Sequence, residues 1–219
     1  MQTKKRTTLV AALLLTMIGS AMALEEPHYD VVAQTPDYEL RRYPSYLVAE
    51  VDVEGDLNSA GNRAFKILAG FIFGNNQGST KMAMTAPVTA RQIDEKKADQ
   101  SGDVTIATQV TSRPRATDEG YTYSFVMERS YTLQSLPAPN DPRVRIRQTE
   151  PRLMAVKRYS GRWNERNDQG HADALITAVE TAGLGRIGEP EMARYNPPFM
   201  PWFMRRNEVA FELLGDSEI

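Results

Sequence analysis

The sequence predicts an α+β fold: a distorted antiparallel β-barrel of about eight strands with two α-helices packed against it. Three observations lead to this prediction. Several segments alternate apolar and polar residues, as half-buried strands do. Two other segments space their apolar residues along one face of a helix. The two halves of the chain also repeat one order of elements, which indicates a weak internal duplication with its join near residues 137–142.

The first half begins with three strands and a helix. Strands are expected, in order, at residues 29–32, 38–43, 46–53, 82–89, 104–111 and 121–128, with a charged loop at 92–103. Between the third and fourth strands, helical spacing over 59–73 predicts the first helix. Asp56 or Asn58 can cap its start, and Gly74 can end it.

The second half repeats this order after a proline-rich linker at 135–142. Strands are expected at residues 144–149, 152–159, 191–195 and 208–213. Ala172, Leu175, Val179 and their neighbours form one face of a second helix, which Gly183 can end. Two such halves can merge into one barrel-like sheet, which removes exposed edges and creates one shared core. The sequence therefore favours one domain over two.

The N-terminus has the pattern of a secretory signal. Lys4, Lys5 and Arg6 precede an apolar run at 9–18, which is shorter than the roughly 20 residues that a membrane span needs. Small residues at Ala21 and Ala23 then fit a cleavage site. We therefore expect a signal peptide at residues 1–23 and a mature domain at 24–219, exported to the periplasm or secreted, soluble and without a membrane anchor after cleavage. The alternative is an uncleaved anchor helix.

Composition excludes several classes of function. Without residues 1–23, which hold three basic and no acidic residues, 23 basic residues face 28 acidic ones, a formal charge of −5. Nucleic acid is then a poor partner, because its binding depends on phosphate neutralisation. The chain has no cysteine, so thiolate catalysis, cysteine-based zinc sites and lipoprotein acylation are excluded.

The sequence offers no catalytic constellation. Its two histidines, His28 and His171, have no metal-ligand spacing, and a surface or helix-cap role is expected for both. No nucleophile elbow, phosphate-binding glycine loop or zinc motif is present. We therefore expect neither an enzyme nor a metal site.

Two segments have unusual composition. In residues 81–88 (KMAMTAPV), Met82 and Met84 would share one face of a strand, where they could either contact a large apolar ligand or fill the core. Residues 195–209 (YNPPFMPWFMRRNEV) crowd aromatic and methionine side chains into a proline-stiffened loop. Such a loop suits either ligand capture or a permanent lid. For Arg205, Arg206 and Glu208, a structural ion pair is the favoured interpretation.

Along residues 29–213 the chain resembles the SOUL haem-binding family. The matching motifs are YELRRYPSYLVAEV, AFKILAGFIFG, KMAMTAPV and NPPFMPWFMRRNEV. The chain is thus identified as an exported bacterial member of that family. The resemblance implies a distorted barrel with two helices built by duplication. It also implies a fold relationship to the effector-binding domains of multidrug-responsive regulators, which are receptors for bulky apolar ligands.

The resemblance further implies binding of haem or another porphyrin as a ligand, through the first helix and the loop before the last strand. The corresponding positions are Asn62, Phe65, Ala69, Gly70 and Met200. Phe65 and Ala69 lie one helical turn apart, where a flat ring could rest. Trp202 belongs to the same aromatic loop and completes the expected site together with Lys66. Lys66, Arg63, Arg205 and Arg206 are candidates to pair with propionates.

The departures from the family pattern concern the iron. Arg42 stands where one branch of the family is proposed to have an axial histidine, and Gly70 and Met200 stand where some members have lysines. We therefore expect binding by ring burial, with little discrimination between haem and metal-free porphyrin. The predicted function is a non-enzymatic tetrapyrrole carrier or buffer in the cell envelope. The alternative is a binding protein for another bulky apolar or amphiphilic molecule. The sequence indicates no protein partner.

Overall fold

The computed structural model describes residues 24–93 and 120–214 of the chain. The expected signal peptide and the expected strand at 104–111 lie outside these residues. The described strands are β1 (Asp30–Gln34), β2 (Glu39–Tyr43), β3 (Leu47–Glu54), β4 (Val88–Gln92), β5 (Gly120–Val126), β6 (Arg145–Gln148), β7 (Arg152–Tyr159), β8 (Arg186–Arg194) and β9 (Asn207–Leu213). The helices are α1 (Leu57–Ile72), α2 (Glu165–Thr181) and the short 3-10 helix η2 (Trp202–Met204).

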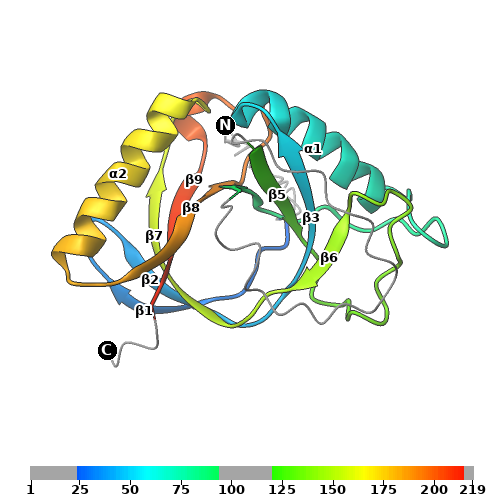
Figure 1. The fold of residues 1–219 in the computed structure, drawn as a ribbon, viewed down its shortest axis with the longest axis horizontal. Coiled ribbons are helices and arrows are strands. Elements are labelled where there is room, and N and C mark those ends of the chain that lie inside the picture. Colours follow the sequence, from blue (N-terminus) through cyan, green and yellow to red (C-terminus); the bar gives the residue numbers. More distant parts are fainter. Residues whose placement is uncertain (1–23, 94–119, 215–219) are drawn as a thin grey trace, which may run out of the picture.

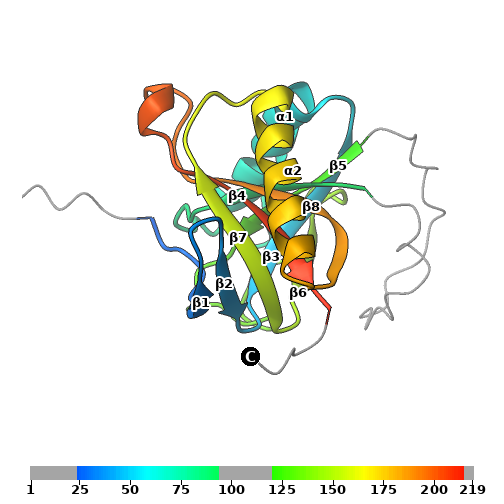
Figure 2. The same ribbon diagram turned by 90° about the vertical axis from the view of Figure 1, so that its left-hand side faces the viewer.

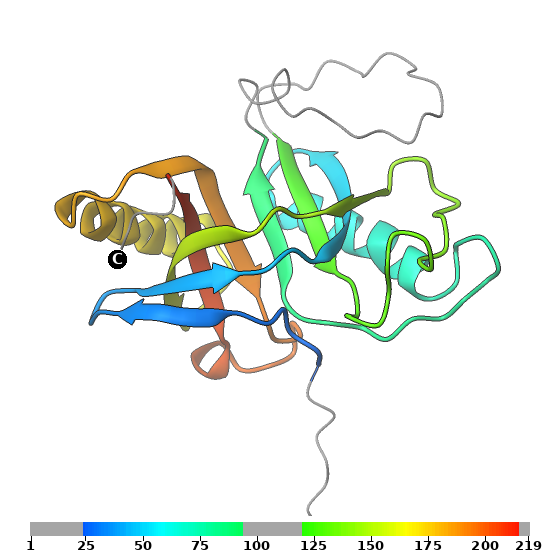
Figure 3. The same ribbon diagram turned by 90° about the horizontal axis from the view of Figure 1, so that it is seen from below.

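The nine described strands form one antiparallel sheet in the order β1-β2-β7-β9-β8-β4-β5-β3-β6. The duplication is visible in this order, because each half contributes two strands, a helix and two more strands, and β1 is an additional strand at one edge. The halves also exchange strands: β2 pairs with β7 of the second half, and β6 pairs with β3 of the first half. Seen from below in Figure 3, the β2–β3 and β6–β7 segments cross from one side of the sheet to the other.

The predicted α+β fold with an antiparallel sheet and two helices is confirmed, but the predicted distorted barrel of about eight strands is wrong, because the nine-stranded sheet is open between β1 and β6. Closure was expected as a means of removing exposed edges. The structure instead keeps its two edge strands short: β1 has five residues and β6 has four. The edge strand β6 also carries Arg145 and Arg147. Short, charged edge strands resist pairing with another chain without closure.

Both helices pack against the same face of the sheet, where the cross-strand partners Ala49 and Phe125 lie under α1, and Val209 lies under α2. Figure 1 shows α2 and α1 on the outside of the strongly curved sheet. The single shared core that we predicted is therefore divided. One apolar cluster lies under α1, another under α2, and a small third cluster around Tyr43 and Met154 lies on the helix-free face.

The ends of the helices follow the sequence signals. The Asp56 carboxylate accepts hydrogen bonds from the backbone N–H groups of Asn58 (3.1 Å) and Ser59 (3.0 Å), as an N-cap does. Gly74 and Gly183 follow the two helices with φ of 112° and 71°, which favours glycine. The second helix begins earlier than its apolar face indicated, because Asn164 caps it. Neither α-helix in the described ranges has the length and apolar character needed to cross a bilayer.

The expected strand at 82–89 begins only at Val88. Pro87 has no N–H to donate to a ladder, and the N–H of Met82 bonds instead to the carbonyl of Ile72 at the end of α1 (2.9 Å). Met82 is buried in the cluster under α1, and Met84 packs against the same cluster. The core-filling interpretation of these two methionines is therefore confirmed.

Candidate functional site

The predicted residues of the first helix lie at the surface of α1 and at its edge with the sheet. Asn62, Phe65 and Lys66 are exposed, and Gly70 is partly exposed. The Phe65 side chain is 43% exposed, and its ring meets Phe125 edge-on, with centroids 5.5 Å apart. Ala69 is buried in the cluster under α1. The expected pairing of an aromatic with an accessible small residue is therefore incomplete, because only Phe65 presents surface to solvent.

The other two predicted residues, Met200 and Trp202, lie in the loop between β8 and β9, residues 195–206, which we call the aromatic loop. Phe199 is 85% exposed, Trp202 49%, and Phe203 and Met204 are each 61% exposed. Four large apolar side chains thus face solvent within six residues. An exposed patch of this kind is typical of a binding surface. Exposure of these side chains also excludes the interpretation of the loop as a lid packed over the core.

Arg205 holds the aromatic loop in shape from within. Its Nε donates to the carbonyl of Met200 (2.8 Å) and its Nη2 to that of Pro198 (2.6 Å). Its guanidinium also lies 4.4 Å from the ring centroid of Trp163, which precedes α2. A further hydrogen bond joins the N–H of Gly161 to the carbonyl of Trp202 (3.1 Å). The loop is therefore ordered before any ligand arrives.

The structure does not join the helix residues to the loop residues. No hydrogen bond or aromatic contact between described residues links α1 to the aromatic loop, whose contacts to the rest of the domain include Gly161, Arg162 and Trp163. Figure 2 shows η2 projecting to one side of the molecule, apart from both helices. The predicted site thus consists of two separate surfaces.

Most of the cations expected to meet propionates already have partners. Arg63 donates to the carbonyl of Glu54, and Arg205 is used by the loop. Arg206 forms ion pairs with Glu208 (3.1 Å) and Glu26 (2.9 Å). The structural ion pair favoured for Arg206 and Glu208 is therefore confirmed. Lys66 remains exposed on α1.

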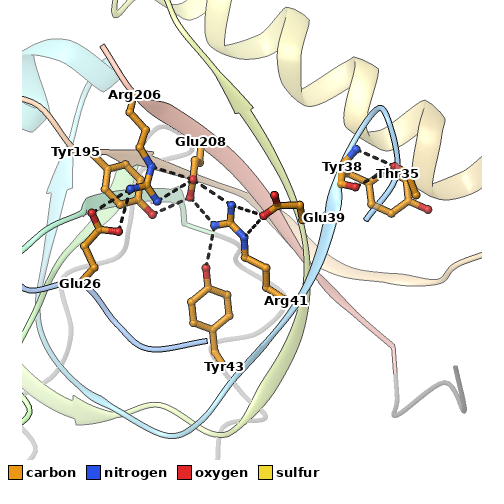
Figure 4. A network of polar contacts seen from close by, with 9 residues as sticks. All are labelled: Glu26, Thr35, Tyr38, Glu39, Arg41, Tyr43, Tyr195, Arg206 and Glu208. Carbon is orange, nitrogen blue, oxygen red and sulfur yellow. Dashed lines mark hydrogen bonds and ion pairs between the residues drawn. The ribbon is translucent and has the colours of Figure 1, made fainter. Parts of the chain in front are cut away.

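A buried polar network occupies the helix-free face of the sheet (Figure 4). Glu208 on β9 is 2% exposed, and its carboxylate accepts hydrogen bonds from Arg41 Nη1 (2.9 Å) and Nη2 (3.2 Å). It also accepts from the Tyr195 hydroxyl (2.7 Å) and from Arg206 Nε (3.1 Å). Arg41 additionally pairs with Glu39 (2.7 Å). The network joins both halves of the chain to the N-terminal segment through Glu26.

Charge pairing decides the protonation states in this network. Burial alone would raise the pKa of Glu208, but the hydrogen bonds and positive charge of Arg41 outweigh it and lower that pKa. Burial alone would lower the pKa of Arg41, but Glu208 raises it. Burial, together with the neighbouring Glu208, raises the pKa of Tyr195. The carboxylate and guanidinium are therefore both charged at neutral pH, and the tyrosine is neutral.

The sequence interpretation did not include Arg41 in this network, nor Arg152 and Glu191 beside it. Arg152 on β7 pairs with Glu191 on β8 (3.3 Å) and donates to the Tyr46 hydroxyl (2.6 Å). The signal was available in the strand alternation: Arg41 alternates onto the same face as Tyr43, and Arg152 onto the same face as Met154 and Val156. Arg41 is buried and Arg152 is 12% exposed on that face.

The positions relevant to iron offer no clear ligand. Arg42 is exposed on β2, His171 stacks on Tyr159 with centroids 4.1 Å apart, and His28 lies beside Asp30 (3.9 Å) near the surface. Among residues 24–93 and 120–214, no group of three or more His, Asp or Glu side chains is placed to hold a metal ion.

Comparison with solved structures identifies relatives of the fold. The C-terminal domain of EcmrR aligns with a TM-score of 0.56 at 11% identity, over 85% of this chain and 98% of that chain. EcmrR in a complex with DNA aligns with a TM-score of 0.54 at 11% identity, over 80% of this chain and 56% of that one. A protein described as a hydrolase from Listeria innocua aligns with a TM-score of 0.52 at 12% identity, over 84% and 94% of the two chains. At these identities the likeness concerns the fold alone.

Sequence comparison identifies the family. No curated protein sequence matches the chain. The family model described as SOUL heme-binding protein matches residues 24–212, which covers nearly all of the described residues. This range includes both α1 and the aromatic loop, the two surfaces that carry the predicted site residues. The chain therefore belongs to the SOUL heme-binding protein family.

Proposed function

We propose that this protein binds haem or a related porphyrin on the aromatic loop and acts as a non-enzymatic carrier or buffer. The observation that carries the proposal is the loop itself: four large apolar side chains, exposed and ordered by Arg205 before binding. A surface ordered in advance loses little conformational entropy when a flat ligand stacks on it. Membership in the SOUL heme-binding protein family supports a tetrapyrrole as that ligand.

The chemistry of the loop favours capture by ring burial. Trp202 and Phe203 present two rings in an edge-to-face arrangement, with centroids 5.7 Å apart, against which a porphyrin face can pack. Arg162 lies over the Trp202 ring at 5.9 Å from its centroid, at the border of this surface. Its guanidinium can pair with a propionate at the rim of the bound ring. Haem would supply the redox-active iron, while these residues bind and orient the macrocycle.

The titration of purified protein with haem and with protoporphyrin tests this proposal, followed by the Soret band and by tryptophan fluorescence. The chain has two tryptophans, and both Trp163 and Trp202 contact the loop or belong to it, so binding there should quench nearly all of the emission. We expect saturable binding of both ligands at micromolar concentration. Absence of any saturable change would refute the proposed function.

Three variants locate the site. Trp202→Ala should weaken porphyrin binding about tenfold, because stacked aromatic contacts contribute on the order of 1 kcal/mol and more. Phe65→Glu tests the α1 surface in the same way. Leu133→Glu, which changes another exposed apolar side chain in the linker after β5, is the matched control. Loss of binding in Phe65→Glu alone would move the site to α1.

A second candidate is a receptor for another bulky amphiphile. The same aromatic loop favours it, since apolar surface does not distinguish a porphyrin from other large apolar ligands. The fold likeness to the EcmrR C-terminal domain is compatible with either ligand. Mass spectrometry of small molecules that co-purify with the protein separates the two candidates.

The proposed place of action is the cell envelope, after removal of residues 1–23. Cleavage there would leave Leu24 as the first residue. The next two residues form ion pairs with the rest of the domain: Glu25 with Arg129 (2.9 Å) and Glu26 with Arg206 (2.9 Å). Mass measurement of protein isolated from its native compartment tests this. Retention of residues 1–23 would refute export by cleavage.

A further inference from the structure

We propose that the helix-free face of the sheet carries a second site, which binds a compact oxyanion such as a carboxylate or phosphate. The site is a small pocket that is partly open to solvent and lies between strands β3 to β8. It lies on the face of the sheet opposite both helices and is distinct from the aromatic loop. The residues that carry the argument are Glu50, Arg91, Arg147, Arg152 and Glu191, all of which line it.

The charges around the pocket do not balance. Three guanidiniums and two carboxylates line it. Arg147 and Glu50 form a two-point ion pair, with Nη2 to Oε1 at 2.6 Å and Nε to Oε2 at 3.1 Å. Arg152 binds Glu191 through one hydrogen bond of 3.3 Å. Arg91 makes no ion pair with a carboxylate of residues 24–93 and 120–214, so within that part of the chain one positive charge of the pocket has no counterpart.

One buried donor in this pocket also lacks a partner. The Arg152 side chain is 12% exposed, and its Nε is the buried side-chain nitrogen that has no hydrogen-bond partner among the described residues. A buried N–H without a partner is rare because its lost hydration is not replaced. Among the described residues, the Arg152 Nε thus lacks an acceptor and Arg91 lacks an ion pair, and both side chains line the same space. Both would be satisfied by an anion with two or more acceptor oxygens.

The rest of the lining fits a small polar ligand. The hydroxyls of Thr89, Thr122 and Ser124 lie on the same walls and can donate to or accept from oxygens of a ligand. A cation is disfavoured, because Glu50 and Glu191 are already bound by arginines. A bulky apolar ligand is disfavoured because it would displace water from the charged side chains of the walls without offering them hydrogen bonds. These constraints together select a compact oxyanion.

The test uses the ligand-free protein, so its result does not depend on porphyrin binding. Inorganic phosphate and acetate are titrated by isothermal calorimetry at constant ionic strength, with sodium chloride as the control salt. We expect saturable binding of at least one of the two, and its identity tells a phosphate ligand from a carboxylate ligand. Removal of a charge-assisted hydrogen bond in Arg91→Gln should weaken binding roughly tenfold or more. Arg166→Gln removes the same charge from the exposed side of α2 and should leave binding unchanged.

Several outcomes would overturn the proposal. The first is heat that tracks ionic strength alone, with no saturation by either anion. The second is equal binding by Arg91→Gln and the unchanged protein. The third is equal weakening by Arg91→Gln and Arg166→Gln, which would indicate general attraction to net charge. Because Arg91 is only partly buried, its replacement is expected to fold. A thermal melt of each variant checks this. Thr89→Val is a second variant of the same wall, which removes a hydroxyl without changing the charge and should also weaken anion binding.

Discussion

Replacement of Glu208 by Gln tests whether the buried network of the helix-free face stabilises the fold. The substitution preserves shape and one acceptor oxygen but removes the charge that faces Arg41 and Arg206. Arg41, which is almost completely buried, would then keep only the partly exposed Glu39 as an ionic partner (2.7 Å). The Tyr195 hydroxyl would also lose a charged acceptor at 2.7 Å. The loss in the free energy of unfolding therefore comes mainly from Arg41 and Tyr195, which stay buried without their charged partner.

The expected loss in the free energy of unfolding is about 3 kcal/mol at pH 7. Removal of one member of a buried ion pair typically costs about 3–5 kcal/mol, because the remaining charge stays buried without compensation. The lower end applies here, since Glu39 still neutralises part of the Arg41 charge. By contrast, Glu180→Gln breaks an exposed pair with Arg186 (3.8 Å) and should cost less than about 1 kcal/mol.

The pH dependence gives a second measure of the same group. The folded-state pKa of Glu208 lies below its ordinary value of 4.5. A lowered pKa means that the contribution is fully present above the ordinary value and is lost as the pH falls through the folded-state pKa. The difference in stability between the unchanged protein and Glu208→Gln should therefore be constant near neutral pH. It should shrink as the pH falls below 4.5.

Urea unfolding followed by tryptophan fluorescence measures both quantities. The unfolding curves of the two forms are compared at pH 7 and at several values below the ordinary pKa of a glutamate, with Glu180→Gln alongside. A Glu208→Gln protein as stable as the Glu180→Gln control would refute the assignment of a stabilising role. So would a stability difference that does not change as the solution is acidified.

Three further predictions concern the core, a helix cap and the loop. Phe211→Ala should cost about 3–5 kcal/mol in urea unfolding, because it empties a fully buried position under α2; a loss below about 1 kcal/mol would contradict this packing. Asn164→Ala should cost about 1 kcal/mol, since its side chain caps α2 through the Asn167 N–H (2.9 Å), and unaltered stability would show that the cap is dispensable. Arg205→Gln removes the hydrogen bonds to Pro198 and Met200 and should speed proteolysis within residues 195–206; an unchanged cleavage rate would mean that other contacts hold the loop.

Local patterns in the sequence determined much of the fold. The alternation in 152–159 predicted β7 with its observed bounds, and Asp56 and Gly74 marked the ends of α1. The composition of 195–209 indicated an aromatic segment, and the family motifs led to the SOUL family. These features succeed because they depend on neighbours along the chain: a cap needs only the next three residues, and a strand face needs only its period of two.

The tertiary structure alone decided the order of strands in the sheet and which charged residues are buried and paired. The exchange of β2 and β6 between halves depends on partners more than 90 residues away, which no local pattern specifies. The sheet also stays open, since short charged edges suffice where closure was expected. Its curvature buries one face, so that Arg41 and Glu208 meet across 167 residues of chain. Arg205 and Arg206 were candidates to pair with the propionates of a ligand. In the folded chain they instead donate to the carbonyl of Pro198 and to the carboxylate of Glu208.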